Sequence, residues 1–324
     1  MRGPALGGCR VWHYDDARTA VRDALRLSRA MTFKSAVAGL PLGGGKGVLM
    51  APDPASPVRR GQRADALRDF GETVESLGGS YITAEDVGTS ARDMEVIATA
   101  TSHVTGLSRK RGGSGDPSPW TALGVQTAIR VSCERIFGSP SLKERTLVLA
   151  GLGHVGHRVA EACAKDGARL LVTDIDATKR EIARELGARW IEPDAALQTP
   201  ADVFVPCALG GVLDHEAASR LEAPVVVGAA NNQLASDDVA DLLAQRGVLW
   251  APDFVVNAGG IINISVELDP GGYDPRRARK LVRGIGDTLR LIYHDAHATH
   301  ATPLAAAMAL ARVRLVEAAA ARSD

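Results

Sequence analysis

The sequence predicts an α/β protein with two domains, an N-terminal α/β domain followed by a doubly wound parallel sheet. Its 324 residues suit about two domains of ordinary size. In the second half, short apolar strands alternate with helical patterns, which is typical of a parallel sheet with helices on both faces. Between the halves lies "LSRKRGGSGDPSP", residues 107–119, whose glycines, serines and prolines indicate a domain junction.

The first half is expected to open with a helix. Residues 15–31 carry apolar side chains at helical spacing, behind aspartates that suit an N-cap. "SAVAGLPLGGGKGVLM", residues 35–50, reads as a strand, a glycine loop and a second strand. Residues 63–77 again show helical spacing, and "YITAEDVG", residues 81–88, is expected to form a short strand that runs into a loop.

The second half is expected to begin with a helix over residues 121–136. A strand over 146–150 precedes helices over 157–166 and 177–186, with "RLLVTDID" as the strand between those helices. Three further strands are expected in "ADVFVPCAL", "PVVVGAAN" and "VLWAPDFVVN". Residues 276–321 are rich in Ala and Arg and are expected to be helical.

Composition argues against several classes of protein. Lys plus Arg and Asp plus Glu both number 38, so no overall charge favours nucleic acid or an anionic membrane. No apolar run approaches the roughly 18 residues of a membrane span, and the N-terminus lacks the apolar segment of a signal peptide, so we expect a cytoplasmic protein. The four cysteines form no C-x-x-C pair, and the histidines at 294, 297 and 300 have no supporting carboxylate or thiolate. Reduced thiols and no metal site are therefore expected.

The strongest local motif is "AGLGHVG", residues 150–156, in which Gly151, Gly153 and Gly156 match G-x-G-x-x-G. It follows an expected strand, opens a helix and precedes a second strand that ends at Asp174, the arrangement of a Rossmann dinucleotide site. Gly151 would make the tight turn, Gly153 would admit the pyrophosphate, and Gly156 would let the helix pack closely on the strand. The helix N-terminus would attract the phosphates. The alternative is a glycine-rich turn that binds no dinucleotide.

The carboxylate of Asp174 indicates which dinucleotide is bound. It would accept a hydrogen bond from the ribose 2′-hydroxyl and repel a 2′-phosphate, which favours NAD over NADP. Lys179 and Arg180 lie close by in the sequence and weaken this preference.

The segment "GLPLGGGKGVLM", residues 39–50, suggests a phosphate loop at first sight. Gly47 follows Lys46 where a Walker motif needs Ser or Thr, so that interpretation is weak. Three consecutive glycines indicate unusual dihedral angles or close approach of backbone. A lysine near another cation and shielded from water loses its proton readily and can act as a base. Lys46, Lys34 and Asp86 would together suit the oxidation of an amino acid.

Seven segments resemble the Glu/Leu/Phe/Val dehydrogenase family, in its leucine, valine and phenylalanine branch. They are "GPALGGCR", "MTFKSAVAGLPLGGGKGV", "YITAEDVGTS", "GGSGDPSP", "PCALGGVL", "GAANNQL" and "APDFVVNAGGIIN". The resemblance implies NAD-dependent reversible oxidative deamination of an L-amino acid to a 2-oxo acid and ammonia. It implies that Lys46 activates the attacking water, that Asp86 exchanges protons with the amino group, and that Lys34 binds the α-carboxylate with help from the backbone near Gly7 and Gly8.

The resemblance also implies the walls of the two binding sites. Asn257 would lie near the substrate, whose side chain would contact Leu6, Ala84, Ile261 and Ile264. The other cofactor contacts are expected from His154, Val155, Lys179, Thr121, Ala208 and Asn231. The four side-chain contacts are apolar, so a glutamate side chain would be buried without a partner. Leucine, valine or isoleucine is preferred, and phenylalanine stays open because one methylene separates such substrates by only about 1–3 kcal/mol.

The resemblance assigns residues 1–118, completed by a C-terminal helix over 300–324, to substrate binding and catalysis, and residues 119–299 to NAD. It implies a homo-oligomer, a dimer or larger. Members of the family normally have a helix and two strands before "GPALGG", whereas this sequence starts at that motif. The favoured interpretation is a start codon assigned too far downstream. The rival one is a chain that lacks part of its first sheet, and such a chain would bind NAD or an amino acid without turnover.

A third hypothesis is another Rossmann enzyme, of the methylene-tetrahydrofolate or shikimate dehydrogenase type. That hypothesis gives the segments "GGSGDPSP" and "NAGGIIN" no role.

Overall fold

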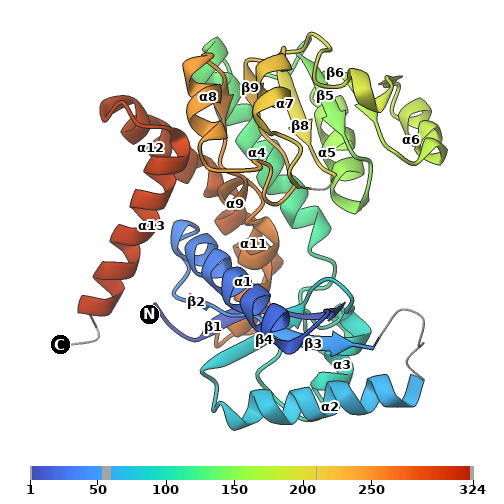
Figure 1. Cartoon of the computed structure of the whole chain (residues 1–324), viewed down its shortest axis with the longest axis vertical. Coiled ribbons are helices and arrows are strands. Elements are labelled where there is room, and N and C mark those ends of the chain that lie inside the picture. The colour runs from blue at the N-terminus through green and yellow to red at the C-terminus, as the bar shows by residue number, and fades with distance from the viewer. Residues whose placement is uncertain (1, 53–59, 209, 322–324) are drawn as a thin grey trace. The chain divides into compact units, whose positions relative to one another are not determined.

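The computed structural model describes residues 2–52, 60–208 and 210–321. The chain divides into two compact units (Figure 1). Unit 1 comprises Met1–Pro117, Ile261–Ala278 and Ala311–Asp324, and unit 2 comprises Ser118–Gly260 and Arg279–Leu310. Each unit holds a parallel sheet with helices, so the predicted α/β fold class is confirmed. Within the described ranges, none of the helices combines the length and the apolar character that a membrane crossing needs.

The sheet of unit 1 is built around β1 (Ala5–His13). Strands β2 (Gly43–Gly44) and β3 (Gly47–Ala51) follow one edge of β1, and β4 (Tyr81–Glu85) follows the other, all in parallel. Strand β1 was not expected from the sequence, because the glycines at positions 7 and 8 are unfavourable in a strand interior. Those glycines mark close approach of other groups to the strand.

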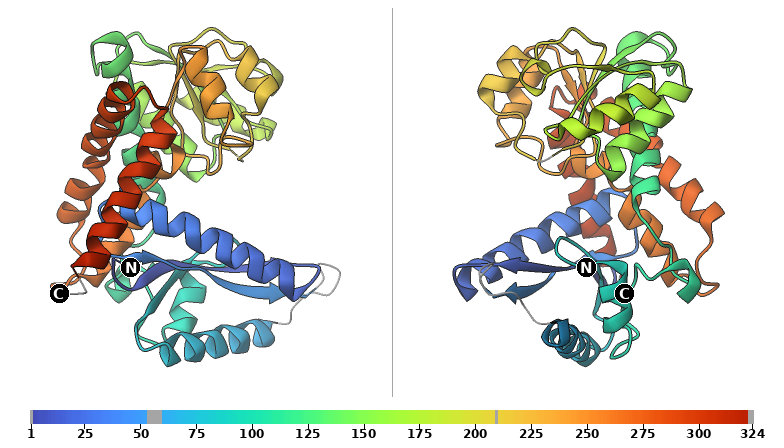
Figure 2. Two further views of the ribbon diagram at one scale, coloured as in Figure 1. Left: turned by 60° about the vertical axis from the view of Figure 1, so that its left-hand side comes forward. Right: turned by 90° about the vertical axis from the view of Figure 1, so that its right-hand side faces the viewer.

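Helices cover both faces of this sheet. Helix α1 (Ala17–Val37) lies on one face, and α2 (Arg60–Ser76) lies on the other (Figure 2). Side chains alternate along a strand, so Leu6 and Gly8 point toward α1, whereas Cys9 points toward α2. The core on that second side contains Cys9, Leu67 of α2, and Met94 and Ile97 of α3 (Ala91–Ile97).

The sheet of unit 2 has six parallel strands in the order β10-β9-β8-β5-β6-β7. They are β5 (Thr146–Ala150), β6 (Arg169–Thr173), β7 (Arg189–Trp190), β8 (Val203–Pro206), β9 (Val225–Val226) and β10 (Leu249–Trp250). The chain first builds outward from β5 to β7 and then from β8 to β10. The order therefore reverses between β5 and β8, and in such sheets ligands bind beyond the carboxyl ends of the strands at that point.

The helices and short turns of unit 2 connect these strands. They are α4 (Ser118–Phe137), α5 (His154–Lys165), η2 (Ala177–Lys179), α6 (Arg180–Glu185), η3 (Pro193–Ala195), α7 (His215–Arg220), α8 (Val239–Gln245), α9 (Asp253–Val256) and α12 (Ile285–Ala298). The remaining elements are η1 (Arg109–Arg111), α10 (Gly259–Ser265), η4 (Val266–Leu268), α11 (Pro275–Arg283) and α13 (Pro303–Ala320).

Two expectations about local structure were wrong. The strand expected from residue 35 is the last turn of α1, where Ala36 and Val37 are fully buried. A short apolar run fits either structure, so its pattern alone could not decide. The strand expected through "VLWAPDFVVN" ends at Trp250, and α9 begins immediately after Pro252. By contrast, the helical structure expected over 276–321 is confirmed, and it consists of α11, α12 and α13.

Candidate active site

Lys46 lies between β2 and β3 and is almost enclosed. Its side chain is 5% exposed, and its Nζ lies 2.8 Å from Oδ1 of Asp86. Asp86 directly follows β4, so its carboxylate reaches Lys46 from the strand on the other side of β1. The structure thus brings together the two residues that the sequence analysis expected to be catalytic.

Asp86 also belongs to a longer chain of charges. Its Oδ2 accepts a hydrogen bond from Nε of Arg10 at 2.8 Å, and Arg10 contacts Asp23 of α1 at 3.1 Å. The hydroxyl of Tyr14 donates to Asp23 at 2.7 Å. Positive and negative groups therefore alternate from Lys46 through Asp86 and Arg10 to Asp23. Such an alternating network holds each side chain in one geometry.

The environment of Lys46 lowers its pKa from the ordinary value. Burial is the largest cause, because removal from water disfavours the charged ammonium group. The neighbouring Asp86 opposes this effect, and the positive charge of Arg10 adds to it. A buried lysine of this kind can exchange a proton more readily than a surface lysine.

The glycines around Lys46 allow other atoms to approach the backbone closely. A Cβ on Gly44 would lie 2.0 Å from the backbone nitrogen of Thr32 in α1. On Gly45 a Cβ would lie 2.6 Å from the ring of Tyr81, and on Gly8 it would lie 2.6 Å from Cβ of Asp86. Of the two explanations that a glycine run allows, close approach applies at these positions.

Apart from Asn257, the other residues expected to contact the substrate lie in unit 1. Lys34 lies in the last turn of α1, and the carbonyl of Gly7 accepts a hydrogen bond from the hydroxyl of Tyr81 at 2.8 Å. The four apolar positions belong to unit 1: Leu6, Ala84 and Ile261 are buried, and Ile264 is half-buried. Leu6 and Ala84 share the α1-facing side of the sheet, since Gly8 is in register with Ala84.

In unit 2, the glycine fingerprint joins β5 to the N-terminus of α5. Gly151 has a φ of +106°, which favours glycine, and a Cβ on Gly156 would lie 1.9 Å from the carbonyl oxygen of Gly151. Gly153 is exposed, and a Cβ there would meet no described atom within 4 Å. His154 and Val155 form the first turn of α5. The turn therefore leaves room for a phosphate beside free backbone N–H groups, which fits a dinucleotide.

Asp174 is held against this turn by hydrogen bonds. Its Oδ2 accepts from the backbone N–H of Leu152 at 2.6 Å, and its Oδ1 accepts from that of Asp176 at 2.9 Å. Lys179 is half-buried at the end of η2. Arg180 forms an ion pair with Glu192 at 2.7 Å.

The remaining residues expected near the cofactor lie in unit 2. A Cβ on Gly151 would lie 2.7 Å from the backbone nitrogen of Ala208, so the loops after β5 and β8 touch where the strand order reverses. The Nδ2 of Asn257 donates to Oδ1 of Asn231 at 2.8 Å, while its buried Oδ1 has no hydrogen-bond partner among the described residues. Thr121 lies at the start of α4, where a Cβ on Gly259 would be 3.0 Å from its Cα.

Sequence reasoning missed several residues that shape these sites. Arg10 lies in β1, which no sequence pattern predicted, and its partners come from other elements. In unit 2, the buried side chain of Gln233 donates to the carbonyls of Gly228 and Ala230 and accepts from Nε1 of Trp250. These contacts fix the loop that carries Asn231. The motif "GAANNQL" contained Gln233, but nothing in the sequence distinguished it from the neighbouring asparagines.

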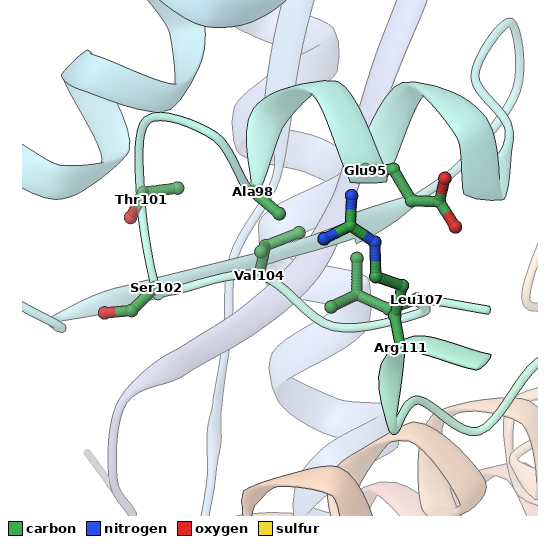
Figure 3. A pocket seen from close by; sticks show the side chains of 7 residues that line it. All are labelled: Glu95, Ala98, Thr101, Ser102, Val104, Leu107 and Arg111. Carbon is green, nitrogen blue, oxygen red and sulfur yellow. The ribbon is translucent and has the colours of Figure 1, made fainter. Parts of the chain in front are cut away.

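A hollow of about 260 Å³ in unit 1 borders α3 and the segment after it. Figure 3 shows the guanidinium group of Arg111 extending between Glu95 and Val104. The residues that line it are Glu95, Ala98, Thr101, Ser102, Val104, Leu107 and Arg111. None of these is an expected site residue, and none belongs to the charge network of Lys46, Asp86, Arg10 and Asp23.

Comparison with known proteins gives consistent results along the chain. A family model described as "Glu/Leu/Phe/Val dehydrogenase, dimerisation domain" matches residues 1–103, and one described as "Glutamate/Leucine/Phenylalanine/Valine dehydrogenase" matches residues 171–323. A leucine dehydrogenase of Thermoactinomyces intermedius is 43% identical over 91% of this chain and 79% of its own length. A valine dehydrogenase of Streptomyces albus is 42% identical over 99% of this chain and 87% of its own.

Solved structures show the same likeness. The crystal structure of L-tryptophan dehydrogenase from Nostoc punctiforme has a TM-score of 0.85 and 37% identity, with 98% of this chain and 90% of that chain covered. A hetero-hexameric glutamate dehydrogenase from Thermus thermophilus has a TM-score of 0.81 at 26% identity, with 99% and 82% covered.

Proposed function

Because the chain belongs to the Glu/Leu/Phe/Val dehydrogenase family, we propose that it catalyses the NAD-dependent, reversible oxidative deamination of an apolar L-amino acid. The amino acid, oxidised NAD and water give the 2-oxo acid, ammonium, reduced NAD and a proton. Leucine, valine and isoleucine are the preferred substrates. The observation that carries this proposal is the buried contact of 2.8 Å between Lys46 and Asp86.

Lys46 and Asp86 divide the proton transfers between them. With its pKa lowered by burial, Lys46 in the neutral form takes a proton from the water that attacks the imino carbon. As the ammonium form, it then stabilises the developing oxyanion. Asp86 exchanges protons with the amino group of the substrate. The contact between Asp86 and Arg10 keeps the carboxylate aimed at Lys46 while these protons move.

Binding of the amino acid combines charged and apolar contacts. Lys34 binds the α-carboxylate together with the backbone near Gly7 and Gly8. The Oδ1 of Asn257, which has no hydrogen-bond partner in the described part of the chain, accepts a hydrogen bond from the ammonium group. The side chain packs on the apolar set Leu6, Ala84, Ile261 and Ile264. A carboxylate placed among those residues would lose its hydration without gaining a partner, at a cost of several kcal/mol. Glutamate is therefore excluded.

Unit 2 binds the dinucleotide at the turn of Gly151, Gly153 and Gly156. A dinucleotide bound there would supply its nicotinamide ring as the acceptor for the α-hydrogen of the substrate and its electron pair. Asp174 accepts from the ribose 2′-hydroxyl, and since its carboxylate is fixed by Leu152 it would repel a 2′-phosphate. Arg180 forms an exposed ion pair with Glu192, which offsets part of its attraction for such a phosphate. We therefore propose NAD as the cofactor, and a higher kcat/KM with NADP would contradict this assignment.

Reductive amination of 2-oxoisocaproate with ammonia, followed as loss of NADH absorbance, tests the proposed function directly. We expect turnover by the parent chain and a loss of at least about 10³-fold in kcat for Lys46→Ala, because the proton acceptor and the oxyanion-stabilising charge disappear together. Lys165→Ala is the matched control, since it removes an exposed lysine that pairs with Glu161 on α5. Equal rates for the parent and Lys46→Ala would reject the role of Lys46.

A panel of 2-oxo acids tests the substrate class. We expect the branched aliphatic acids to give the highest kcat/KM and 2-oxoglutarate to give none that can be measured. A higher kcat/KM for phenylpyruvate would place the enzyme with phenylalanine dehydrogenases instead.

We also propose a homo-oligomer in the cytoplasm. The family model that matches residues 1–103 is described as a dimerisation domain, which supports association through unit 1. The four cysteines are free thiols, as expected in a reducing compartment. Light scattering coupled to size-exclusion chromatography would give the mass in solution, and a monomer would contradict the proposal.

A further inference from the structure

The side chain of Tyr81 crosses the sheet of unit 1 underneath Lys46. Tyr81 is in register with Ala5, so it points to the face opposite Leu6 and Gly8, which is the face of α2. From β4 the ring passes over Gly7 of β1 and reaches Gly45, where a Cβ would lie 2.6 Å from the ring carbon Cδ2. This path exists because the strands carry no side chains at Gly7, Gly45 and Gly47.

The hydroxyl of Tyr81 makes its two shortest hydrogen bonds at the end of this path, while its contacts with the carbonyl of Gly8 and Oγ1 of Thr83 are longer, at 3.5 and 3.4 Å. It donates to the carbonyl of Gly7 at 2.8 Å and accepts from the backbone N–H of Gly47 at 3.0 Å. The second bond is to the amide that directly follows Lys46. Burial raises the pKa of the Tyr81 hydroxyl, so it stays protonated and keeps donating throughout the pH range of an assay.

We propose that Tyr81 is a positioning residue for Lys46: its hydroxyl fixes the peptide after Lys46 to β1 and so sets where the ammonium group meets Asp86. This inference rests on the proposed role of Lys46. Glycine has the widest choice of backbone angles, and Lys46 stands between two of them, Gly45 and Gly47. The backbone on either side is paired with β1, since the N–H of Gly45 donates to the carbonyl of Leu6 at 3.2 Å and Gly47 is in register with Cys9. The hydroxyl of Tyr81 adds a side-chain restraint from the other face of the sheet.

The distances show why such a restraint affects catalysis. A displacement of about 1 Å at a reacting group can cost about 10²-fold in rate. Lys46 meets Asp86 at 2.8 Å, and its side chain is buried on the α1 face, whereas Tyr81 contacts the following peptide on the α2 face. Loss of the hydroxyl would leave the ring and the strand pairing in place but remove one restraint on the peptide, so the ammonium group would be held less closely at that position.

Tyr81→Phe is the decisive variant because it removes only the hydroxyl. We expect kcat to fall about tenfold with KM for NAD unchanged. We also expect the acid limb of the pH profile for oxidative deamination to move to higher pH. Burial is the main cause of the lowered pKa of Lys46, so a loosened lysine regains contact with water and its pKa rises toward the ordinary value. A residue that served packing alone would not move this limb.

Tyr293→Phe is the matched control in unit 2. Its buried hydroxyl lies 2.7 Å from Oγ of Ser132, so the variant loses a comparable hydrogen bond away from Lys46. It should lower the thermal midpoint of unfolding as Tyr81→Phe does, but leave kcat and the pH profile unchanged. Circular dichroism at the assay temperature confirms that each variant is folded. A further variant, Tyr81→Leu, removes the ring as well.

The outcomes separate this inference from the proposed function. If Lys46→Ala is inactive but Tyr81→Phe has the parental kcat and pH profile, the positioning role is wrong and the function stands. A loss that appears only in Tyr81→Leu would show that the ring packs and the hydroxyl is dispensable, which also overturns the inference. If Lys46→Ala keeps full activity, the proposed function itself fails.

Discussion

The site in unit 1 is built from charges, whereas the corresponding site in unit 2 is built from neutral amides. Around Asp86, Lys46 and Arg10 contribute full charges within hydrogen-bond distance. Around Asn257, the partners are the side chain of Asn231 and the carbonyl of Ala229. Charges in a poorly solvated region respond to pH, and amides do not. We therefore propose that unit 1 supplies the groups that move protons, while unit 2 supplies amides that do not titrate.

Glycine is also used differently in the two units. In unit 1, Gly44, Gly45 and Gly47 let a helix and aromatic rings approach the sheet. In unit 2, Gly151 adopts a φ of +106°, which a residue with a Cβ adopts only under strain. The glycines of unit 1 allow neighbouring groups to pack closely around Lys46. Gly151 of unit 2 lets the chain turn sharply, so that backbone N–H groups face outward.

The largest expected loss of activity comes from removing a charge from the site in unit 1. Asp86→Asn keeps the shape of the side chain but removes its negative charge and its capacity to carry a proton. We expect kcat to fall by about 10²–10⁴-fold, the range of a lost acid–base group. Asp86 also raises the pKa of Lys46, so the residual activity should have its acid limb at lower pH than the parent.

Asp166→Asn is the control for this change. Asp166 accepts hydrogen bonds from Arg130 and Gln126 in unit 2, and its loss should leave both kcat and the pH profile as they are. If Asp86→Asn lowered kcat without moving the acid limb, the electrostatic link between Asp86 and Lys46 would be refuted.

The second largest loss of activity is expected on removing an amide from the site in unit 2. Asn257→Leu removes a buried acceptor and two hydrogen bonds, and we expect kcat/KM for the amino acid to fall by about 10²-fold, which corresponds to about 2.7 kcal/mol. The pH profile should not move, because no titrating group is lost. Steady-state kinetics across pH would measure both quantities.

Gln126→Leu is the matched control, since this amide lies in unit 2 away from Asn257 and donates to Asp166. It should keep the parental kcat/KM. A shift in the pH profile of Asn257→Leu would contradict the proposal that only the site in unit 1 responds to pH.

Local sequence patterns were sufficient to predict those parts of the fold whose residues follow one another along the chain. The strand expected over residues 146–150 coincides with β5, because an apolar strand, three glycines and a helix follow one another there. Lys46 and Asp86 stood out because glycines flank the first and a strand precedes the second. That they touch depends on β1, which separates β2 and β3 from β4 and which no pattern predicted.

The parts that could not be predicted depend on contacts across strands. Tyr81 acts on the backbone of Gly7 and Gly47, and a backbone partner leaves no trace in the sequence. Arg10 meets Asp86 and Asp23 from two different elements, and such charge networks follow from the register of the sheet. Residue types therefore indicated the chemistry, while register decided which residues share a site.

The smallest expected effect is a loss of stability on removal of Asp93, a charge of unit 1 to which we assign no role in catalysis. Asp93 caps α3 by accepting from the backbone N–H of Ser90 at 2.9 Å, and it pairs with Arg63 at 3.0 Å. Burial alone would raise the pKa of Asp93, but the hydrogen bonds from Arg63 and Ser90 outweigh it and hold the pKa below the ordinary value. The carboxylate therefore stabilises the folded state when it is ionised.

The sign of the pH dependence follows from that lowered pKa. The stabilisation is fully present above the unfolded pKa of about 3.9 and is lost as the pH falls through the lower folded value. Asp93→Asn should cost about 1 kcal/mol in the free energy of unfolding at pH 7, and the difference from the parent should vanish in strong acid. Urea unfolding at several pH values measures this, and kcat at pH 7 should be unchanged. A fall in kcat at constant stability would mean that the charges governing proton transfer in unit 1 extend beyond the network of Lys46, Asp86, Arg10 and Asp23.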